Sequence, residues 1–412
     1  MASRALGGRT PAAAALAIAL LAGCGSRARD QPAGKVAGRT LTIYVSVPLH
    51  GASAISGTAI LNGAQMALDD TKGRIGRYTV VLRRIDDSNP TKGGWDPGRT
   101  SDGARTAAAD PTTIGYIGDQ DSGASAISIP VLNRAGIAQV SPTSTAVGLT
   151  SARSGAAPGE PDKYYPSGAR TFARVVPSDA FQAAVLVSLQ RSLGCARTYI
   201  VEDGEVDGED LATSFDLAAR AAGLDVVATE EFDPRATDYR ALAASIASTN
   251  SSCVLISAIA DSNAVALTAQ LAAALPSVRI FGGGGLAEST YARELSAARV
   301  IITSPALGGS AYPPAGRAWL RAYARRYGAP EPDAILGYEA MRVLLDAVSR
   351  ATDRGRKAAE RSRVVAALFE TRLRRSVLGA FNIEPDGDTS SRRIGVWIAN
   401  ARRLQFWKTV GG

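Results

Sequence analysis

Short hydroxyl side chains follow two apolar, strand-like runs in the first half of the chain. Ser122 stands after the first run, and Thr143, Ser144 and Thr145 stand after the second. Hydroxyl groups and the free backbone N–H groups at the start of a helix are donors that hold an anion such as a carboxylate. In an open α/β sheet both loops fall in the crevice outside the strand ends, so we expect them to act together on one ligand. The alternative interpretation is that these residues only cap helices and form turns.

A dense group of acidic residues follows a strand-like run near the middle of the chain. It comprises Glu202, Asp203, Glu205, Asp207, Glu209 and Asp210. A catalytic carboxylate needs an apolar pocket that raises its pKa. A dense charge run punctuated by glycine is more typical of a solvated face. We therefore expect most of these carboxylates to be exposed, with some of them on the ligand side of the sheet.

The patterns that carry catalysis or cofactor binding are missing or weak. The chain has one histidine, His50, and a single imidazole does not make a metal cluster. There is neither a G-x-S-x-G elbow nor a P-loop. Gly282, Gly284 and Ala287 fit a relaxed dinucleotide fingerprint, but no acidic residue follows about 20 positions later to take a ribose hydroxyl. We expect no cofactor, no metal and no enzymatic activity.

The elements that must position these residues alternate between strand and helix. Strand-like runs at 40–47, 78–85, 114–118 and 137–140 are separated by segments of helical period. Apolar strands that alternate with helices are typical of a parallel sheet covered on both faces. After a Gly/Pro/Ser-rich stretch at 151–168 the alternation resumes, which predicts a second lobe of the same kind.

Three helical segments and three strand-like runs complete the chain. The helices are expected at 315–327, 332–351 and 357–371, and the strands at 376–383, 394–399 and 404–409. We expect the helices to cover the first lobe and the strands to cross back to the second. The prediction is an α/β protein with two doubly wound parallel-sheet lobes joined by a multi-strand hinge. The predicted N-terminal lobe is 39–174 plus 305–377, and the predicted C-terminal lobe is 175–304 plus 378–411.

The first residues have the layout of a secretory signal. Residues 1–23 combine a basic start, an apolar stretch of about eleven residues and small residues before Cys24. The stretch is shorter than the ~20 residues that a spanning helix needs. Leu21-Ala22-Gly23-Cys24 resembles the lipobox of bacterial lipoproteins, which implies cleavage before Cys24 and its lipidation. We predict a flexible tether at 24–38 and a soluble body that a lipid holds at the membrane.

Two further cysteines, Cys195 and Cys253, precede strand-like runs of the second lobe. In a sheet of order 2-1-3-4-5 the first and third strands are neighbours, so both thiols would lie at the same edge. Secreted proteins occupy a compartment that permits disulfides. We predict a disulfide between them, and two free thiols are the alternative.

Composition limits the remaining function classes. The chain has 412 residues, of which 46% are hydrophobic and 20% charged, which is ordinary globular composition and excludes disorder. Lys and Arg number 46 against 38 Asp and Glu, but the Arg residues are scattered. We expect a soluble, mildly basic surface and no binding of nucleic acid.

Five short motifs occur in order along the chain. They are Leu49-His50-Gly51 with Gly57 and Gly63; Tyr116-Ile117-Gly118 with Ser122; Val140-Ser141-Pro142-Thr143-Ser144-Thr145; Asp207-Gly208 with Leu211-Ala212; and Gly337-Tyr338-Glu339-Ala340 with Leu345. Together they resemble the branched-chain amino-acid (Leu/Ile/Val) binding proteins, which are type I periplasmic binding proteins of ABC transporters. The resemblance implies a two-lobed receptor with a three-stranded hinge that closes on its ligand. It also implies that Ser122, Thr143 and Thr145 hold the ligand's carboxylate.

Three positions depart from the family pattern. Asp207 stands where the family usually has Tyr, Ile259 and Ala260 stand where it often has aromatic residues, and Gly284 stands nearest to its amine-binding acid. A desolvated ammonium needs a charged partner, so Asp207 or Asp121 would have to replace that acid. Otherwise the ligand has no amine and is a carboxylate or amide compound. The small residues leave room for a bulkier ligand.

These observations favour a lipid-anchored substrate-binding protein of an ABC importer. It would stand on the outer face of the bacterial cytoplasmic membrane, bind a small polar solute with a carboxylate, and deliver it to a membrane permease. A sensor ectodomain that binds a ligand without transport is one alternative, and a secreted enzyme is another.

Overall fold

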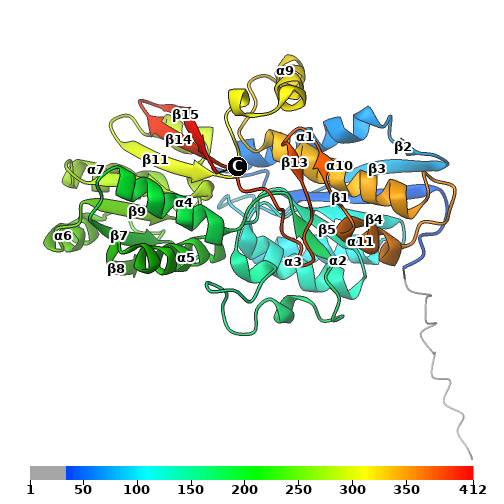
Figure 1. The fold of residues 1–412 in the computed structure, drawn as a ribbon, viewed down its shortest axis with the longest axis horizontal. Helices are drawn as coiled ribbons and strands as arrows, with labels where there is room; N and C mark the ends of the chain where they lie inside the picture. The colour runs from blue at the N-terminus through cyan, green and yellow to red at the C-terminus, as the bar shows by residue number, and fades with distance from the viewer. Residues whose placement is uncertain (1–33, 412) are drawn as a thin grey trace, which may run out of the picture. The chain divides into compact units, whose positions relative to one another are not determined.

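The computed structural model describes residues 34–411, and strand–helix alternation within them builds two mainly parallel sheets (Figure 1). The predicted α/β fold class with two doubly wound lobes is confirmed. The predicted signal segment 1–23 and Cys24 lie outside the described residues. Of the predicted tether, residues 34–38 are described; Val36 is buried there and donates its N–H to the carbonyl of Ala359 at 2.9 Å.

The first sheet has the strand order β2-β3-β1-β4-β5-β6. Its strands are β1 (Thr40–Val47), β2 (Arg74–Ile75), β3 (Tyr78–Asp86), β4 (Thr113–Ile117), β5 (Ala138–Ser141) and β6 (Phe172–Arg174). All neighbours are parallel except the short edge strand β2. Apart from β2, the order is 2-1-3-4-5, so the carboxyl ends of β1 and β4 lie next to each other at the switch point of the sheet.

Helices cover both faces of this sheet, and β1 is accordingly buried on both. Leu41 and Ile43 pack in one core with α1 (Ala54–Asp70), α10 (Ala334–Ala351) and α11 (Arg361–Phe369). Tyr44 points to the other face and packs with α2 (Pro97–Ala109) and α3 (Ser122–Arg134). Helix α9 (Pro314–Tyr327) joins the first core through Trp319, whose ring lies 5.1 Å from that of Tyr338. The three late helices therefore cover the first lobe, as predicted.

The second sheet has the strand order β15-β14-β11-β10-β9-β7-β8. Its strands are β7 (Arg197–Glu202), β8 (Asp225–Glu231), β9 (Cys253–Ser257), β10 (Arg279–Gly282), β11 (Arg299–Ser304), β14 (Ile394–Asn400) and β15 (Arg403–Val410). The first five are parallel and repeat the 2-1-3-4-5 order, whereas β14 and β15 add antiparallel strands at the β11 edge. The terminal strands thus return to the second lobe, as expected.

The second lobe is also layered on both faces. Helices α4 (Asp179–Ser192) and α5 (Val206–Ala222) pack with Ile200 and Phe281 on one face. Helices α6 (Arg240–Ser248), α7 (Ala264–Ala274) and α8 (Ser289–Glu294) pack with Tyr199 and Val254 on the other. Four short 3-10 helices complete the description: η1 (Val147–Leu149), η2 (Asp162–Tyr164), η3 (Gly284–Leu286) and η4 (Gly309–Ala311).

Within residues 34–411, three segments carry the chain between the two sheets. They connect β6 to α4, β11 to α9, and the short strand β13 (Ala380–Phe381) to β14. The strand predicted at 376–383 is wrong, because the chain reverses there between β12 (Arg374–Arg375) and β13 (Ala380–Phe381). The N–H of Ser376 donates to the carbonyl of Gly379 at 3.0 Å, and Gly379 adopts a φ of +117°, which glycine tolerates.

Cys195 and Cys253 form a disulfide with a Cα–Cα distance of 5.8 Å. Strands β7 and β9 are neighbours, and Cys253 lies opposite Thr198 in their register. The bridge therefore ties the segment before β7 to the start of β9. It joins these elements at the edge of the sheet opposite to the carboxyl ends of its strands.

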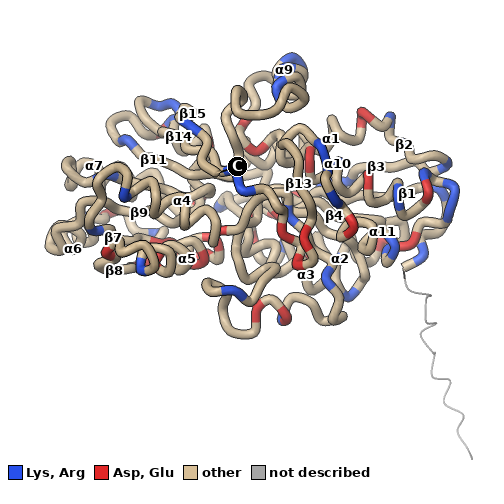
Figure 2. The backbone as a smooth tube through the Cα atoms, in the orientation of Figure 1, with Lys and Arg blue, Asp and Glu red and all other residues tan. Residues whose placement is uncertain are grey.

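Charged residues of both signs are spread along the chain (Figure 2). The Lys and Arg residues do not gather in one stretch, but acidic residues concentrate where α5 approaches α3. This acidic concentration lies at the contact between the two lobes, where the candidate site is found.

Candidate ligand-binding site

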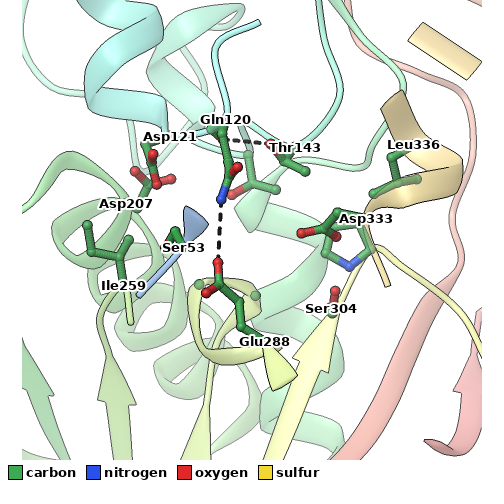
Figure 3. Close-up of a pocket in the computed structure, with 14 residues that line it drawn as sticks. Ser53, Gln120, Asp121, Thr143, Asp207, Ile259, Glu288, Ser304, Asp333 and Leu336 are labelled. Carbon is green, nitrogen blue, oxygen red and sulfur yellow. Dashed lines mark hydrogen bonds between the residues drawn. The ribbon is translucent and has the colours of Figure 1, made fainter. Parts of the chain in front are cut away.

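A small polar cavity lies where the carboxyl ends of both sheets face each other. The centres of water molecules can occupy a volume of about 50 Å³ within it. The first lobe contributes Ser53, Gln120, Asp121, Thr143, Thr145, Pro305, Asp333 and Leu336, and the second contributes Asp207, Ile259, Gly284, Gly285, Glu288 and Ser304 (Figure 3). A cavity of this size holds a few water molecules or a small compound.

Most of the predicted site residues line this cavity. They are Asp121, Thr143, Thr145, Asp207, Ile259 and Gly284. Ser122 and Ser144 are not part of the lining. The Ser144 hydroxyl is buried against Ser125 Oγ at 2.8 Å and the carbonyl of Asp119 at 3.0 Å, so it holds the loop rather than facing the cavity.

The donors at the start of α3 are engaged by a carboxylate of the chain itself. Ser122 donates its N–H to Asp207 Oδ2 at 2.8 Å and its hydroxyl to Asp207 Oδ1 at 2.6 Å. The same hydroxyl accepts the N–H groups of Thr145 and Ala146, each at 3.2 Å. The sequence predicts an anion at this helix start, and the structure places there a side chain of the opposite lobe.

The start of α1 is engaged in the same way. Asp261, which follows β9 in the second lobe, accepts the N–H groups of Ala52 at 2.6 Å and Ser53 at 3.2 Å. A Cβ on Gly51 would lie 2.5 Å from Asp261 Oδ1, so glycine is required for this approach. Because the first N–H groups of a helix have no partner within it, a carboxylate from the other lobe satisfies them well.

Further carboxylates cross between the lobes. Asp210 of α5 accepts the N–H of Val147 with both oxygens at 3.0 Å. In the opposite direction, Glu331 of the first lobe accepts the N–H of Ser289 at 3.2 Å and its hydroxyl at 2.5 Å. Charged acceptors on backbone donors make strong hydrogen bonds, so these contacts hold the two lobes together around the cavity.

Four carboxylic acids line the cavity: Asp121, Asp207, Glu288 and Asp333. Loss of solvent raises the pKa of Asp207 to about 6, although the hydrogen bonds from Ser122 act against the shift. The same cause raises the pKa of Asp333 to about 6, and Ser56, whose hydroxyl lies 3.0 Å from Oδ2, opposes it.

The other two acids are buried. Burial, followed by the negative charge of Asp207, holds the pKa of Asp121 well above its usual range. Burial, followed by the negative charge of Asp261, does the same for the pKa of Glu288. No Lys or Arg is among the described residues that line the cavity, so no side chain there compensates these acids.

Gln120 connects the two lobes above the cavity. Its Nε2 donates to Glu288 Oε1 at 3.4 Å, and its backbone carbonyl accepts the Thr143 hydroxyl at 2.7 Å (Figure 3). Its Oε1 is buried and has no hydrogen-bond partner within the described part of the chain. Asp121 is the N-cap residue of α3, yet its side chain makes no capping hydrogen bond and lies beside Asp207 (Figure 3).

Sequence reasoning missed Ser53, Gln120, Glu288 and Asp333. Gln120 precedes Asp121 in the loop between the predicted strand 114–118 and Ser122, so its position in the sequence could have indicated that it lies at the site. Glu288 lies four residues beyond Gly284, where the family's amine-binding acid was sought, and a carboxylate is present there after all. Asp333 precedes α10, which was interpreted only as a covering helix, and no local pattern marks it.

The expectation that the acidic run 202–210 is mostly exposed is wrong. Glu202, Asp203 and Asp210 are buried, and among the six acids only Glu209 is exposed. Asp203 shows the reason, because it accepts the N–H of Ile259 at 2.9 Å and that of Glu205 at 3.1 Å. The loops at the strand ends expose many backbone donors, and these acids satisfy them.

Neither a metal-binding group of side chains nor a membrane-spanning helix is found among residues 34–411. In that part of the chain no group of three or more His, Cys, Asp or Glu is placed to hold a metal ion. No helix within it is both long and apolar enough to cross a membrane.

Two doubly wound lobes that meet around a polar cavity at their strand ends define a solute-binding protein of the bilobal kind. A family model for periplasmic binding proteins matches residues 14–399, and the chain belongs to this family. The homologues are solute-binding proteins, not enzymes. Membership places the chain outside the cytoplasm.

Individual relatives are distant but cover nearly the whole chain. The Leu/Ile/Val-binding protein BraC3 of Rhizobium johnstonii is 26% identical over 380 residues, which span 88% of this chain and 93% of the relative. The leucine-binding protein LivK of Thermotoga maritima has a TM-score of 0.76 at 21% identity, covering 90% of this chain and 98% of its own. A solute-binding protein of an ABC transporter from R. palustris, solved with benzoate, has a TM-score of 0.72 at 16% identity, covering 90% and 96%.

Proposed function

We propose that the chain is the lipid-anchored substrate-binding component of an ABC importer. Its solute is an amino acid or a related small amine, amide or carboxylate, and it binds in the cavity between the lobes. The loaded protein then delivers the solute to a membrane permease. The observation that carries this proposal is the enclosed polar cavity at the facing strand ends, bridged by hydrogen bonds from both lobes.

The relatives support the solute class. The Rhizobium protein is named for leucine, isoleucine and valine, and the R. palustris structure contains benzoate. Both classes of ligand are small and carry a polar group at one end. The family's ABC transporter context supports a permease as the partner, and the lipobox-like segment before Cys24 supports the anchor.

The three crossing segments support a hinge. We take the moving parts to be residues 39–174 with 305–377 and residues 175–304 with 378–411. Closure brings Asp207, Asp210 and Asp261 onto backbone donors of the first lobe. Opening breaks these contacts and exposes the cavity, so the solute binds to the open form and the closed form retains it.

A cavity-blocking variant tests this function. A Cβ on Gly284 would lie 3.5 Å from Gln182 Oε1 and Pro305 Cδ and 3.9 Å from the carbonyl of Thr303, so the fold accepts a side chain that extends into the lining. Gly284→Leu should fold with an unchanged melting temperature but lose solute binding by at least about 100-fold, because the leucine occupies the ligand's space. Thermal-shift screening of the mature wild type over amino acids, amines, amides and aromatic carboxylates supplies the solute, and calorimetry gives the affinities.

The matched control is Gly309→Leu. Gly309 lies outside this cavity, and its nearest neighbour to an added Cβ is Leu320 Cδ1 at 3.4 Å. This variant should bind the solute as the wild type does. If no compound in the screen stabilises the wild type, or if Gly284→Leu binds as tightly as the wild type, the proposed function is wrong.

A further inference from the structure

The two helix starts that face the cleft already hold anions. Asp207 occupies the N–H and hydroxyl donors of Ser122 at the start of α3, and Asp261 occupies the N–H groups before α1. Both aspartates belong to the second lobe and reach the first lobe only when the two lobes meet. A ligand carboxylate at either helix start would have to displace one of these side chains. The closed arrangement therefore does not need a carboxylate from the solute.

The remaining cavity wall is rich in acceptors. Asp121, Glu288 and Asp333 line it together with Gln120, and none of the other lining residues is basic. Gln120 Oε1 is buried without a hydrogen-bond partner, and the Asp121 side chain does not cap its helix. Unpartnered acceptors in a desolvated cavity are stabilised by a donor, and a cationic ligand supplies one.

We propose that the solute is a small organic cation, a primary amine or amidine that carries no free carboxylate. This inference rests on the proposed function and names its substrate class. The cationic group donates to Asp121, Glu288 and Gln120 Oε1, while Asp207 supplies the negative charge at α3 that an amino acid would bring with it. Asp207 bound at the start of α3 thus sets the ligand class.

Further acidic groups act on the two carboxylic acids that hold the proposed cation. Asp87, Asp207, Asp261 and Glu288 act on Asp121, and Asp261, Asp333 and Glu331 act on Glu288. Crowded, desolvated carboxylic acids retain protons, and a bound ammonium favours their ionised forms. Binding should therefore release protons at neutral pH, and the affinity for an amine should rise with pH.

Matched pairs of compounds test the ligand class. The probes are 3-methylbutylamine against L-leucine, and 2-phenylethylamine against L-phenylalanine; each pair differs by one carboxylate. 4-Methylpentanoate and benzoate are the carboxylates without an amine. We expect the amine of a pair to bind at least about 10-fold more tightly than its amino acid, the carboxylates not to bind, and calorimetry at pH 7 to show proton release that differs in heat between phosphate and Tris buffers.

Variants connect this preference to the residues. Asp207→Gly frees the donors of Ser122, so the preference should reverse and the amino acid should bind more tightly than the amine. Glu288→Gln should weaken the amine by at least about 10-fold and leave the melting temperature of the ligand-free protein within a few degrees of the wild type. Asp162→Asn, whose side chain is 94% exposed, is the control and should change nothing.

Several outcomes overturn the inference while leaving the proposed function intact. They are tighter binding of an amino acid or a carboxylate than of the matched amine, uptake rather than release of protons, and an unchanged preference in a folded Asp207→Gly variant. Binding of an uncharged amide or of no probe amine also overturns it. The proposed function itself fails only if no solute of any class binds in the cavity.

Discussion

Asp207 is the residue whose position most changes the interpretation of the site. The sequence marks it as a departure from the family pattern and as one candidate to replace a missing acid. In the structure it meets Ser122, so the helix start predicted to bind a ligand's carboxylate binds this side chain instead. The sequence did not predict this contact, because Asp207 lies 85 residues from Ser122 and no local pattern joins the two loops.

Because acids with raised pKa values line the cavity, we expect the folding stability of the protein to fall as the pH rises. Desolvation raises the pKa of Asp333 to about 6. Because the folded state binds this proton more tightly than the unfolded chain, its stabilising contribution is complete below about pH 4 and is lost as the pH rises through about 6. A shift of about two pKa units corresponds to roughly 3 kcal/mol. Asp207, with a pKa also near 6, acts in the same direction.

The measurement is urea unfolding of the ligand-free protein at pH 5 and pH 8. The wild type should be less stable at pH 8, and Asp333→Asn should remove part of the difference because an amide has no proton to lose. The amide oxygen still accepts the Ser56 hydroxyl, which keeps the local contact. Equal pH dependence of the two proteins would show that Asp333 does not titrate as described.

At the scale of elements, periodicity and strand order were predictable from the sequence. The strand 40–47 has the predicted bounds, the helix predicted at 315–327 is found at Pro314–Tyr327, and both sheets contain the order 2-1-3-4-5. The 376–383 segment failed because a turn at Ser376–Gly379 splits it into two short strands, and four residues decide such a reversal. The cavity was only partly predictable, since Glu288 and Asp333 reach it through the packing of η3 and α10 rather than through any motif.

The contact of Asp261 with the start of α1 leads to a prediction about lobe closure and solute affinity. Asp261→Ala removes the acceptor for two backbone N–H groups of the opposite lobe. A hydrogen bond to a charged group contributes about 1.5–3 kcal/mol, so the closed form should lose stability of this order and the solute should bind about 10- to 100-fold more weakly. The affinity is measured by calorimetry.

The control for this helix start is Asp225→Ala, an exposed aspartate at the beginning of β8. It removes a carboxylate from the same lobe without touching the cleft, so the affinity should not change. A wild-type affinity for Asp261→Ala would mean that the contact at α1 contributes nothing to closure. Trp95 packs against Gly123 at the start of α3, so its fluorescence is a second measure of whether the cleft is closed.

At the scale of the molecule, the two lobes together form one binding site that encloses a polar solute. Each lobe alone presents helix starts with free donors or loops with free carboxylates, and each lacks the partners for them. When the lobes meet, the carboxylates of Asp207, Asp210 and Asp261 find their donors, and the cavity closes around four acids and the unpartnered Oε1 of Gln120. In the proposed function the solute supplies the partners that these groups lack.

A crystal structure of the mature protein with the solute that stabilises it most tests the central claim directly. The account predicts electron density for that solute between the lobes, in contact with Glu288 of the second lobe and Thr145 of the first, with both lobes closed on it. Density for the solute on any other surface, beside an empty cavity, would contradict it.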